Sequence, residues 1–173
     1  LVERSEILLR KPVKKRRGLY RDMAIVSDLD QNLIGDSKSL KALNELLREN
    51  RRASSFIIAT GRRLDSALKL IKKHAIQVPD VLITSSGTEI YHAPKLAFDT
   101  AWSSHIDYHW SPRRIRRLLA DYPGLKPQPK IEESRYKLSY YIDQKKADAE
   151  EIRQLLHREE LAFFLQTAFG QFL

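Results

Sequence analysis

The sequence predicts an α/β fold in which a parallel sheet with helices is followed by a second, smaller α+β unit. Between residues 23 and 87, three short apolar runs that end in polar or small residues alternate with two amphipathic helical patterns. Such alternation builds a parallel sheet with right-handed crossovers. From about residue 93 the rhythm changes to proline-flanked segments and a strand of alternating polarity, which indicates a separate unit.

The composition limits the class of protein. The 173 residues, 42% of them hydrophobic, suffice for one compact domain or two small ones. The absence of cysteine excludes a disulfide-stapled scaffold and a zinc or iron–sulfur site with cysteine ligands. No apolar run reaches the length of about 18 residues that a membrane-spanning helix needs, and the first ten residues carry four charges where a signal peptide needs an apolar core. We therefore expect a cytoplasmic protein without membrane contacts.

The net charge of +9 is concentrated near the N-terminus. Residues 1–21 hold eight of the 31 basic and two of the 22 acidic side chains, a net charge of +6, which leaves +3 for residues 22–173. The run from Arg10 to Gly18 lacks apolar periodicity and contains proline and glycine, as a solvated linker does. We predict a basic linker over residues 1–21 and no nucleic-acid partner, because the rest of the chain is only mildly basic.

The first unit is predicted to consist of three buried parallel strands and two helices. Residues 23–28 form an apolar run that ends abruptly in acidic residues, the pattern of a buried strand that opens onto a polar site. The predicted helix Ser37–Asn50, capped by its first residue, has leucines on one face. A second strand over residues 55–60 leads through a glycine into a helix with an apolar face from Leu64 to Ile71. A third strand, residues 81–84, ends in Ser-Ser-Gly.

The second unit is predicted to combine helices with a small sheet. Pro112 is placed to start a helix, and a proline-flanked segment follows at residues 125–128. The strand over residues 137–143 alternates in polarity, so one of its faces packs on helices and the other is free to meet a ligand. A helix over about residues 147–157 and an apolar run over residues 161–166 complete the unit.

Polar residues gather where the predicted parallel strands end, which is where doubly wound sheets bind ligands. Asp28 and Asp30 are separated by one residue. If the chain turns sharply there, both carboxylates face the crevice, and Mg²⁺ relieves their repulsion. Thr60, Gly61 and Arg62 add a phosphate-sized pocket with a hydroxyl, close backbone approach and a positive charge. For the first motif alone, a pair of exposed turn aspartates that cap the next helix is the alternative.

Two further groups of residues have competing interpretations. His105 and His109 would share a helix face and reach one metal ion, but no third ligand lies nearby in the sequence, which favours ordinary surface histidines. We expect Trp102, Tyr108 and Trp110 to form an apolar seam between the two units rather than a platform for base stacking.

The motifs at the strand ends resemble those of a known family. Residues 28–33 after the first strand and residues 57–62 after the second resemble the first two motifs of the haloacid dehalogenase-type phosphohydrolases. Within that superfamily the chain is most similar to the sucrose-phosphate phosphatase branch, and to the phosphatase-like domain behind the glycosyltransferase of bacterial sucrose-phosphate synthases. The segments that carry this closer resemblance are Ser27–Asp36, Ala59–Ala67, Leu82–Tyr91, Leu125–Gln128 and Lys137–Tyr141.

This resemblance implies a Rossmann-like parallel sheet core of the haloacid dehalogenase type with an inserted α+β cap domain. The N-terminal part of the core would occupy residues 22–92 and the cap residues 93–168, with the return into the core starting at residues 169–173. The basic residues 1–21 would then be the linker from a covalently attached glycosyltransferase domain.

The resemblance also implies a covalent mechanism on sucrose 6-phosphate. Asp28 would attack the phosphorus, and Asp30 would protonate the leaving sugar oxygen and later activate water. Mg²⁺ would be held by Asp28 and the backbone carbonyl of Asp30. Thr60, with Gly61 and Arg62, would bind the phosphate. The residues implied to bind the sugar hydroxyls are Glu89, Lys126, Gln128, Lys137 and Ser139.

Two departures from the family pattern bear on activity. Asn32 stands where the family usually carries Thr or Val, a change expected to keep the turn but to alter phosphate contacts. The family also uses a later lysine and a late acidic motif, and no Asp or Glu lies beyond Glu160. We therefore expect a fragment with an incomplete core, which binds Mg²⁺ weakly and turns over little by itself.

Two functions are compatible with these residues. The first is hydrolysis of sucrose 6-phosphate, and the alternative is a non-catalytic phosphatase-like module that regulates or stabilises an attached sucrose-phosphate synthase. The presence of both Asp28 and Asp30 favours catalysis, because a binding module does not need a nucleophile beside an acid. Asn32 and the missing late motifs favour the module.

Overall fold

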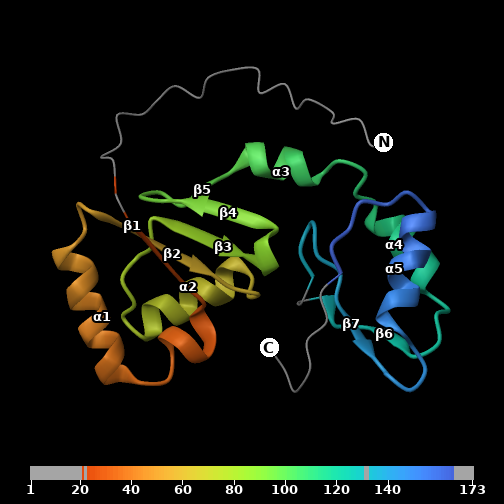
Figure 1. Ribbon diagram of the computed structural model, residues 1–173, viewed down its shortest axis with the longest axis horizontal. Helices are drawn as coiled ribbons and strands as arrows, with labels where there is room; N and C mark the ends of the chain where they lie inside the picture. Colours follow the sequence, from red (N-terminus) through yellow and green to blue (C-terminus); the bar gives the residue numbers. More distant parts are fainter. Residues whose placement is uncertain (1–20, 22, 131–132, 166–173) are drawn as a thin grey trace.

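The computed structural model describes residues 21, 23–130 and 133–165, which form two sheets with their own helices (Figure 1). The strands are β1 (Met23–Ser27), β2 (Ser54–Ala59), β3 (Val81–Thr84), β4 (Glu89–His92), β5 (Ala97–Phe98), β6 (Leu125–Pro127) and β7 (Tyr140–Ile142). The helices are α1 (Ser37–Glu49), α2 (Leu64–Lys73), α3 (Thr100–Ile106), α4 (Pro112–Leu119) and α5 (Ala149–Arg158). In this part of the chain, no helix has the length and apolar character to cross a membrane.

The larger sheet has the strand order β1-β2-β3-β4-β5, and its first three strands pair in parallel, with Ile25 opposite Phe56. The three predicted strands and the two helices between them are confirmed. Because these strands run in one direction, their carboxyl ends lie at one edge of the sheet. In the described part of the chain β1 is an outer strand, and its Met23 and Val26 are 55% and 60% exposed.

The helices α1 and α2 bury one face of this sheet. Residues of β2 alternate between buried and half-buried, the period of a strand with one fully covered face. Phe56 and Ile58 of β2 pack in one cluster with Leu47 of α1 and Ile71 of α2. Full burial of each large apolar side chain contributes about 1.5–3 kcal/mol, so this cluster fixes the position of the sheet against both helices.

The structure contains two antiparallel strands, β4 and β5, that the sequence did not predict. The chain reverses at Ser85, Ser86 and Gly87, whose φ values are 52°, 59° and 90°. A left-handed backbone is uncommon for serine, so the residues before Gly87 carry no standard turn signal. Strand β5 keeps the chain in the larger sheet as far as Phe98, past residue 93, where the cap was expected to start.

The start of α1 differs from the prediction by one residue. Asp36 rather than Ser37 is the N-cap, and its Oδ1 accepts a hydrogen bond from Lys38 N at 2.9 Å. The Ser39 hydroxyl also donates to this carboxylate, and the two hydrogen bonds, that from Ser39 first, hold the pKa of Asp36 below its usual value. A carboxylate also interacts favourably with the positive end of the helix, which explains why Asp36 takes the capping position.

The smaller sheet packs against α4 and α5. Ile115 of α4 and Ile152 of α5 lie in one apolar cluster with Ile142 of β7, so the predicted apolar face of this strand is confirmed. The strand is shorter than predicted, because Lys137 instead pairs with Ser134 in a separate short bridge. This second cluster is separate from the one under the larger sheet.

The helices of the second unit start at a proline and at an aspartate. Helix α4 begins at Pro112, as predicted. Helix α5 begins later than predicted, because Asp148 is its N-cap and accepts a hydrogen bond from Glu150 N at 2.8 Å. Residues 161–165 belong to no helix or strand. The end of the predicted apolar run, the return to the core and all of the basic linker except Arg21 lie outside the described residues.

Helix α3 and the residues after it correct two sequence-based interpretations. His105 lies in α3, but His109 follows the helix with a φ of 55°, so the two do not share a helix face and cannot form the metal pair that this spacing suggested. Trp102 Nε1 donates a hydrogen bond to Gly87 O at 2.9 Å and links α3 to the turn before β4. Tyr108 is 72% exposed, so its placement in an apolar seam is wrong.

A buried amide joins α1 to the segment before β3. Asn44 is 6% exposed, its Oδ1 accepts a hydrogen bond from Gln77 N at 2.9 Å, and its Nδ2 donates to Ala75 O at 3.0 Å. We expect Asn44→Ala to lower the free energy of unfolding by about 1–3 kcal/mol, measured by urea denaturation, because two backbone groups lose these partners. The control Asn50→Ala removes only an exposed bond to Leu46 O and should cost less than about 1 kcal/mol. Equal losses in the two variants would contradict this account.

Candidate active site

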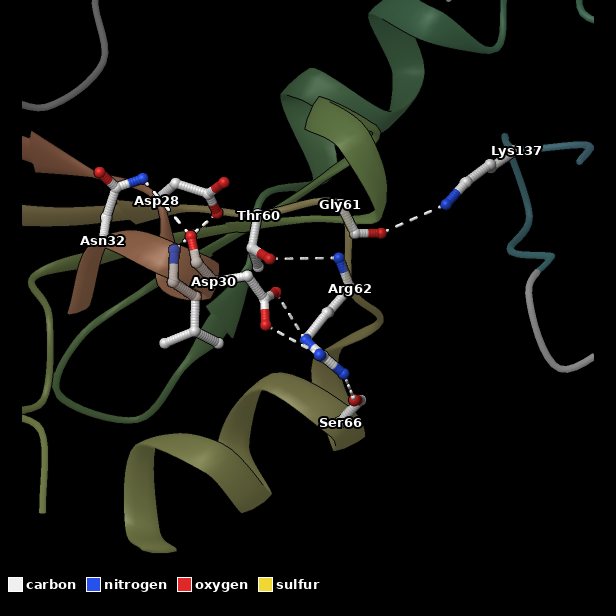
Figure 2. Close-up of polar contacts among 9 residues, drawn as sticks. Asp28, Asp30, Asn32, Thr60, Gly61, Arg62, Ser66 and Lys137 are labelled. Atoms are coloured by element: carbon white, nitrogen blue, oxygen red, sulfur yellow. Dashed lines mark hydrogen bonds and ion pairs between the residues drawn. The ribbon is translucent and has the colours of Figure 1, made fainter. Parts of the chain in front are cut away.

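A sharp turn after β1 carries the two candidate acids. Asp28 Oδ1 accepts a hydrogen bond from Leu29 N at 2.6 Å, and Ile34 N closes the turn on Leu29 O at 3.2 Å. Gln31 has a left-handed φ of 59° inside the turn, and the fully buried Leu29 anchors the turn in the core. The sharp turn that the sequence interpretation requires is therefore present, and Figure 2 shows Asp28 and Asp30 close together beside the end of β2.

The two acids have different surroundings. Asp28 is exposed, whereas the Asp30 side chain is only 19% exposed. Both Asp30 oxygens accept hydrogen bonds from Arg62, with Nε to Oδ2 at 2.7 Å and Nη2 to Oδ1 at 2.8 Å. Arg62 Nη1 also donates to Ser66 Oγ at 3.2 Å. Two-point contacts of this kind are among the strong hydrogen bonds of proteins. The guanidinium that the sequence interpretation places on a phosphate thus holds Asp30 (Figure 2).

The end of β2 forms the rest of the predicted phosphate pocket. Thr60 is 6% exposed, and its Oγ1 accepts a hydrogen bond from Arg62 N at 3.2 Å, so the hydroxyl hydrogen can be donated to a ligand. A Cβ at Gly61 would lie 3.5 Å from Ser86 Oγ, which is an ordinary contact, so packing within the protein does not demand glycine there. The missing side chain instead gives a ligand close access to the backbone.

The acidic turn offers two oxygen donors to a cation. Asp28 supplies an exposed carboxylate, and Asp30 supplies its backbone carbonyl, which accepts a long hydrogen bond of 3.4 Å from Asn32 Nδ2. Across residues 21, 23–130 and 133–165, no group of three or more His, Cys, Asp or Glu side chains is placed to hold a metal ion. Mg²⁺ keeps several waters and binds through one or two carboxylates together with substrate phosphates, so this donor set fits a magnesium site rich in water.

Two of the five predicted sugar-binding residues approach the residues at the strand ends. Lys137 Nζ donates to Gly61 O at 3.2 Å and so connects the second unit to the predicted phosphate loop (Figure 2). Glu89 opens β4 of the larger sheet rather than lying in the cap, and its Oε2 accepts hydrogen bonds from Thr84 Oγ1 at 3.3 Å and from Tyr91 OH at 3.1 Å. Burial, followed by the charge of Glu89, raises the pKa of Tyr91 to about 12.

The other three predicted sugar-binding residues lie on or beside the smaller sheet. Lys126 is exposed on β6, and Gln128 N donates to Ser139 O at 2.9 Å. They are separate from the cavity that the structure forms next to Glu89. This cavity, of about 420 Å³, is lined by Arg63, Leu64, Asp65, Glu89, Tyr91, Ser134 and Arg135. Arg63, Leu64, Asp65 and Tyr91 lie in segments that carry the family resemblance, but only Glu89 was predicted to bind the sugar, because these residues meet Ser134 and Arg135 only when the two units fold.

The fold and the strand-end residues together define a class of protein. A parallel sheet with an Asp-x-Asp turn after its first strand and Thr-Gly-Arg after its second, joined to an α+β unit, is the arrangement expected of haloacid dehalogenase-like hydrolases. The fold of a haloacid dehalogenase-like hydrolase from Bacillus subtilis is similar, with a TM-score of 0.55 and 19% identity over 81% of this chain and 56% of that chain. The predicted α/β fold class is confirmed.

Within this class, the chain belongs to the sucrose-6F-phosphate phosphohydrolase family, whose family model matches residues 21–173. It is similar to the sucrose-phosphatase of Synechocystis, solved in complex with sucrose and phosphate, with a TM-score of 0.70 and 32% identity over 82% of this chain and 57% of that chain. It is also 33% identical over 147 residues to probable sucrose-phosphatase 3b of Arabidopsis thaliana, which covers 80% of this chain and 35% of that protein. The predicted family is confirmed.

The chain spans about a third of the length of the curated sucrose-phosphatases that it matches. A shorter segment of the chain is similar to part of a protein with a different name. Probable sucrose-phosphate synthase 3 of Arabidopsis thaliana is 44% identical over 72 residues, which is 38% of this chain and 7% of that protein.

The pKa of Tyr91 tests the arrangement around Glu89. The phenol has a pKa of about 12 in the fold against 10.0 for the free group, so its contribution to stability is complete below pH 10 and is lost as the pH rises to about 12. We expect Glu89→Gln to lower this pKa without bringing it to 10, because burial is the larger cause. Absorbance titration of tyrosinate measures the shift, and Tyr91→Phe identifies the signal. Ionisation of Tyr91 near pH 10 in the protein without substitutions would show that the arrangement around Glu89 is wrong.

Proposed function

We propose that this chain supplies the N-terminal part of the core, together with the cap, of a Mg²⁺-dependent phosphatase that hydrolyses sucrose 6-phosphate in sucrose biosynthesis. The observation that carries the proposal is the meeting of Asp28, Asp30 and Thr60 at one edge of the larger sheet (Figure 2). An exposed carboxylate, a second acid and a buried hydroxyl are the groups that phosphoryl transfer from a sugar oxygen requires. The proposed location is the cytoplasm, which the composition favours.

Asp28 is the proposed nucleophile and Asp30 the proposed acid and base. The hydrogen bond from Leu29 N holds Asp28 Oδ1, and the second oxygen of this exposed carboxylate attacks the phosphorus. The bond between phosphorus and the sugar oxygen breaks as an aspartyl-phosphate forms, and Asp30 gives its proton to that oxygen. Asp30 then takes a proton from the water that attacks the phosphorus, which releases phosphate and restores Asp28.

The proposed phosphate site lies between the acidic turn and the end of β2. Thr60 donates its hydroxyl to a phosphate oxygen, and Gly61 lets the phosphate approach the backbone. The Asp28 carboxylate and the Asp30 carbonyl would hold Mg²⁺, which when bound neutralises negative charge on the phosphoryl group. Arg62 adds positive charge beside this pocket.

The second unit is the proposed cap for the sugar. Lys137 already contacts the phosphate loop at Gly61 O, which supports a position near the substrate. Glu89 of β4 is a further proposed sugar contact, because it lines the same cavity as Ser134 of the second unit. The remaining proposed sugar contacts are Lys126, Gln128 and Ser139 of the smaller sheet.

The parent protein is proposed to be a sucrose-phosphate synthase in which this chain follows a glycosyltransferase domain. The match of 72 residues to a probable sucrose-phosphate synthase supports this context. Residues 1–21, with their net charge of +6, would be the linker between the two domains. The proposal includes no nucleic-acid or membrane partner.

Replacement of the nucleophile tests the reaction. In the parent protein with Mg²⁺, we expect Asp28→Asn to abolish phosphate release from sucrose 6-phosphate, because an amide oxygen does not form the aspartyl-phosphate. The matched control is Asp36→Asn, since Asp36 is an exposed carboxylate that caps α1 and lies outside the site. Phosphate release at the parent rate by Asp28→Asn would rule out the catalytic proposal.

Measuring phosphate release together with substrate binding separates the catalytic proposal from the alternative of a regulatory module. A module binds sucrose 6-phosphate without releasing phosphate, which calorimetry detects in a parent protein that shows no turnover. That outcome would favour regulation of the synthase over hydrolysis.

Removal of the cap contact tests the role of Lys137. We expect Lys137→Ala to raise KM for sucrose 6-phosphate with little change in kcat, because its contact would be made equally in the ground state and the transition state. The control is Lys145→Ala, which changes an exposed lysine away from this contact. An unchanged KM in steady-state kinetics of Lys137→Ala would exclude the proposed contact.

A further inference from the structure

We propose that Arg62 is a positioning residue that sets the orientation of the Asp30 carboxylate, rather than a ligand of the phosphate. This inference rests on the proposed function, in which Asp30 transfers the proton. Its basis is the two-point contact of Arg62 with Asp30 at 2.7 and 2.8 Å. A guanidinium presents its N–H groups in one rigid plane, so a carboxylate that accepts at both oxygens is held in that plane.

The turn itself does not fix the Asp30 side chain. Asp30 has an extended backbone, with φ −77° and ψ 137°, and the next residue, Gln31, is left-handed. A side chain on such a turn rotates about two bonds unless another element restrains it. Arg62 supplies that restraint from the end of β2, and the pair is partly shielded from solvent, with side-chain exposures of 36% for Arg62 and 19% for Asp30. The lone pairs of Asp30 outside this contact then point in a defined direction for proton exchange.

Arg62 is itself held by three neighbouring segments. Its backbone N donates to Thr60 Oγ1 at 3.2 Å, and its backbone O accepts a hydrogen bond from Ser85 N at 2.7 Å. Its Nη1 donates to Ser66 Oγ at 3.2 Å in the first turn of α2. The backbone of Arg62 is therefore fixed at the end of β2 and at the turn after β3, and its guanidinium is fixed on α2. Figure 2 shows the contacts of Arg62 with Thr60, Ser66 and Asp30.

The two roles of Arg62 have different kinetic consequences. A phosphate ligand contributes to the affinity for every phosphate, so its loss raises KM and the inhibition constant of inorganic phosphate. A positioning residue acts only when the proton moves, so its loss lowers kcat and leaves both of those constants unchanged.

The test is steady-state kinetics of Arg62→Ala and Arg62→Lys in the parent protein with sucrose 6-phosphate and Mg²⁺. We expect kcat to fall about 10²-fold in Arg62→Ala, the cost of a small misplacement of a reacting group, with KM and phosphate inhibition unchanged. Arg62→Lys should rescue little, because one ammonium group does not hold two oxygens in a plane. Added guanidinium ion should restore part of kcat in Arg62→Ala. A raised inhibition constant for phosphate with an unchanged kcat would overturn the proposal.

Two further variants serve as controls. Arg51→Ala breaks a comparable contact, Nη1 to Asp80 Oδ2 at 2.8 Å, away from the acidic turn, and should leave kcat unchanged. Ser66→Ala removes only the contact of Arg62 Nη1 with Ser66 and should lower kcat less than Arg62→Ala does. If Arg62→Ala does not fold, Ser66→Ala provides the test instead. An unchanged kcat in Ser66→Ala would then count against the proposal.

A parent protein that releases no phosphate would contradict the proposed function without deciding the role of Arg62. Calorimetry with inorganic phosphate and Mg²⁺ then decides it. Loss of phosphate affinity in Arg62→Ala overturns the positioning role, and an unchanged affinity supports it.

Discussion

The parallel pairing of β1 with β2 is the constraint on which the site depends. Ser27 lies opposite Ile58 in the register, so Asp28 and Thr60 leave two neighbouring strands at the same edge and at nearly the same level. A slip of one residue would exchange the two faces of a strand, and the alternation of buried residues on β2 opposes it. The apolar cluster that fixes this register therefore also fixes the distance between the acidic turn and the hydroxyl.

In this arrangement, Asp28 and Asp30 differ in how far their side chains are buried. Asp28 faces solvent and offers a carboxylate to a ligand or cation, whereas Asp30 is turned toward an arginine. Sequence spacing treats the two as equivalent, but a single buried leucine between them separates their environments. This asymmetry suits the two chemical tasks proposed for these residues, in which one carboxylate is reached by phosphorus and the other is held in a fixed orientation.

The sequence predicts the parts of this structure that depend on local patterns. The three parallel strands follow from short apolar runs, and α4 follows from Pro112, because both signals act over a few residues. The acids and the hydroxyl were found because strand ends in such sheets meet at one edge. The roles of these residues in phosphoryl transfer stay a prediction.

The features that the sequence did not predict depend on geometry between distant residues. The bond from Arg62 to Asp30 spans 32 positions, and only the folded arrangement of the turn and β2 brings them together. The start of β4 depends on two serines with a left-handed backbone, a conformation that the residue type serine does not predict. The N-cap of α1 was misplaced because Asp36 and Ser37 are both good caps, and their competition is decided by backbone geometry and charge.

The outer position of β1 has a consequence for handling the chain. Along one side of this strand, the described part of the structure provides no neighbouring strand, and the strand carries two largely exposed apolar side chains, Met23 and Val26. Unpaired backbone groups beside apolar side chains template the addition of a strand from another molecule. We expect such a strand to promote self-association in concentrated samples of this chain alone, and a charged substitution at the exposed Val26 to reduce it.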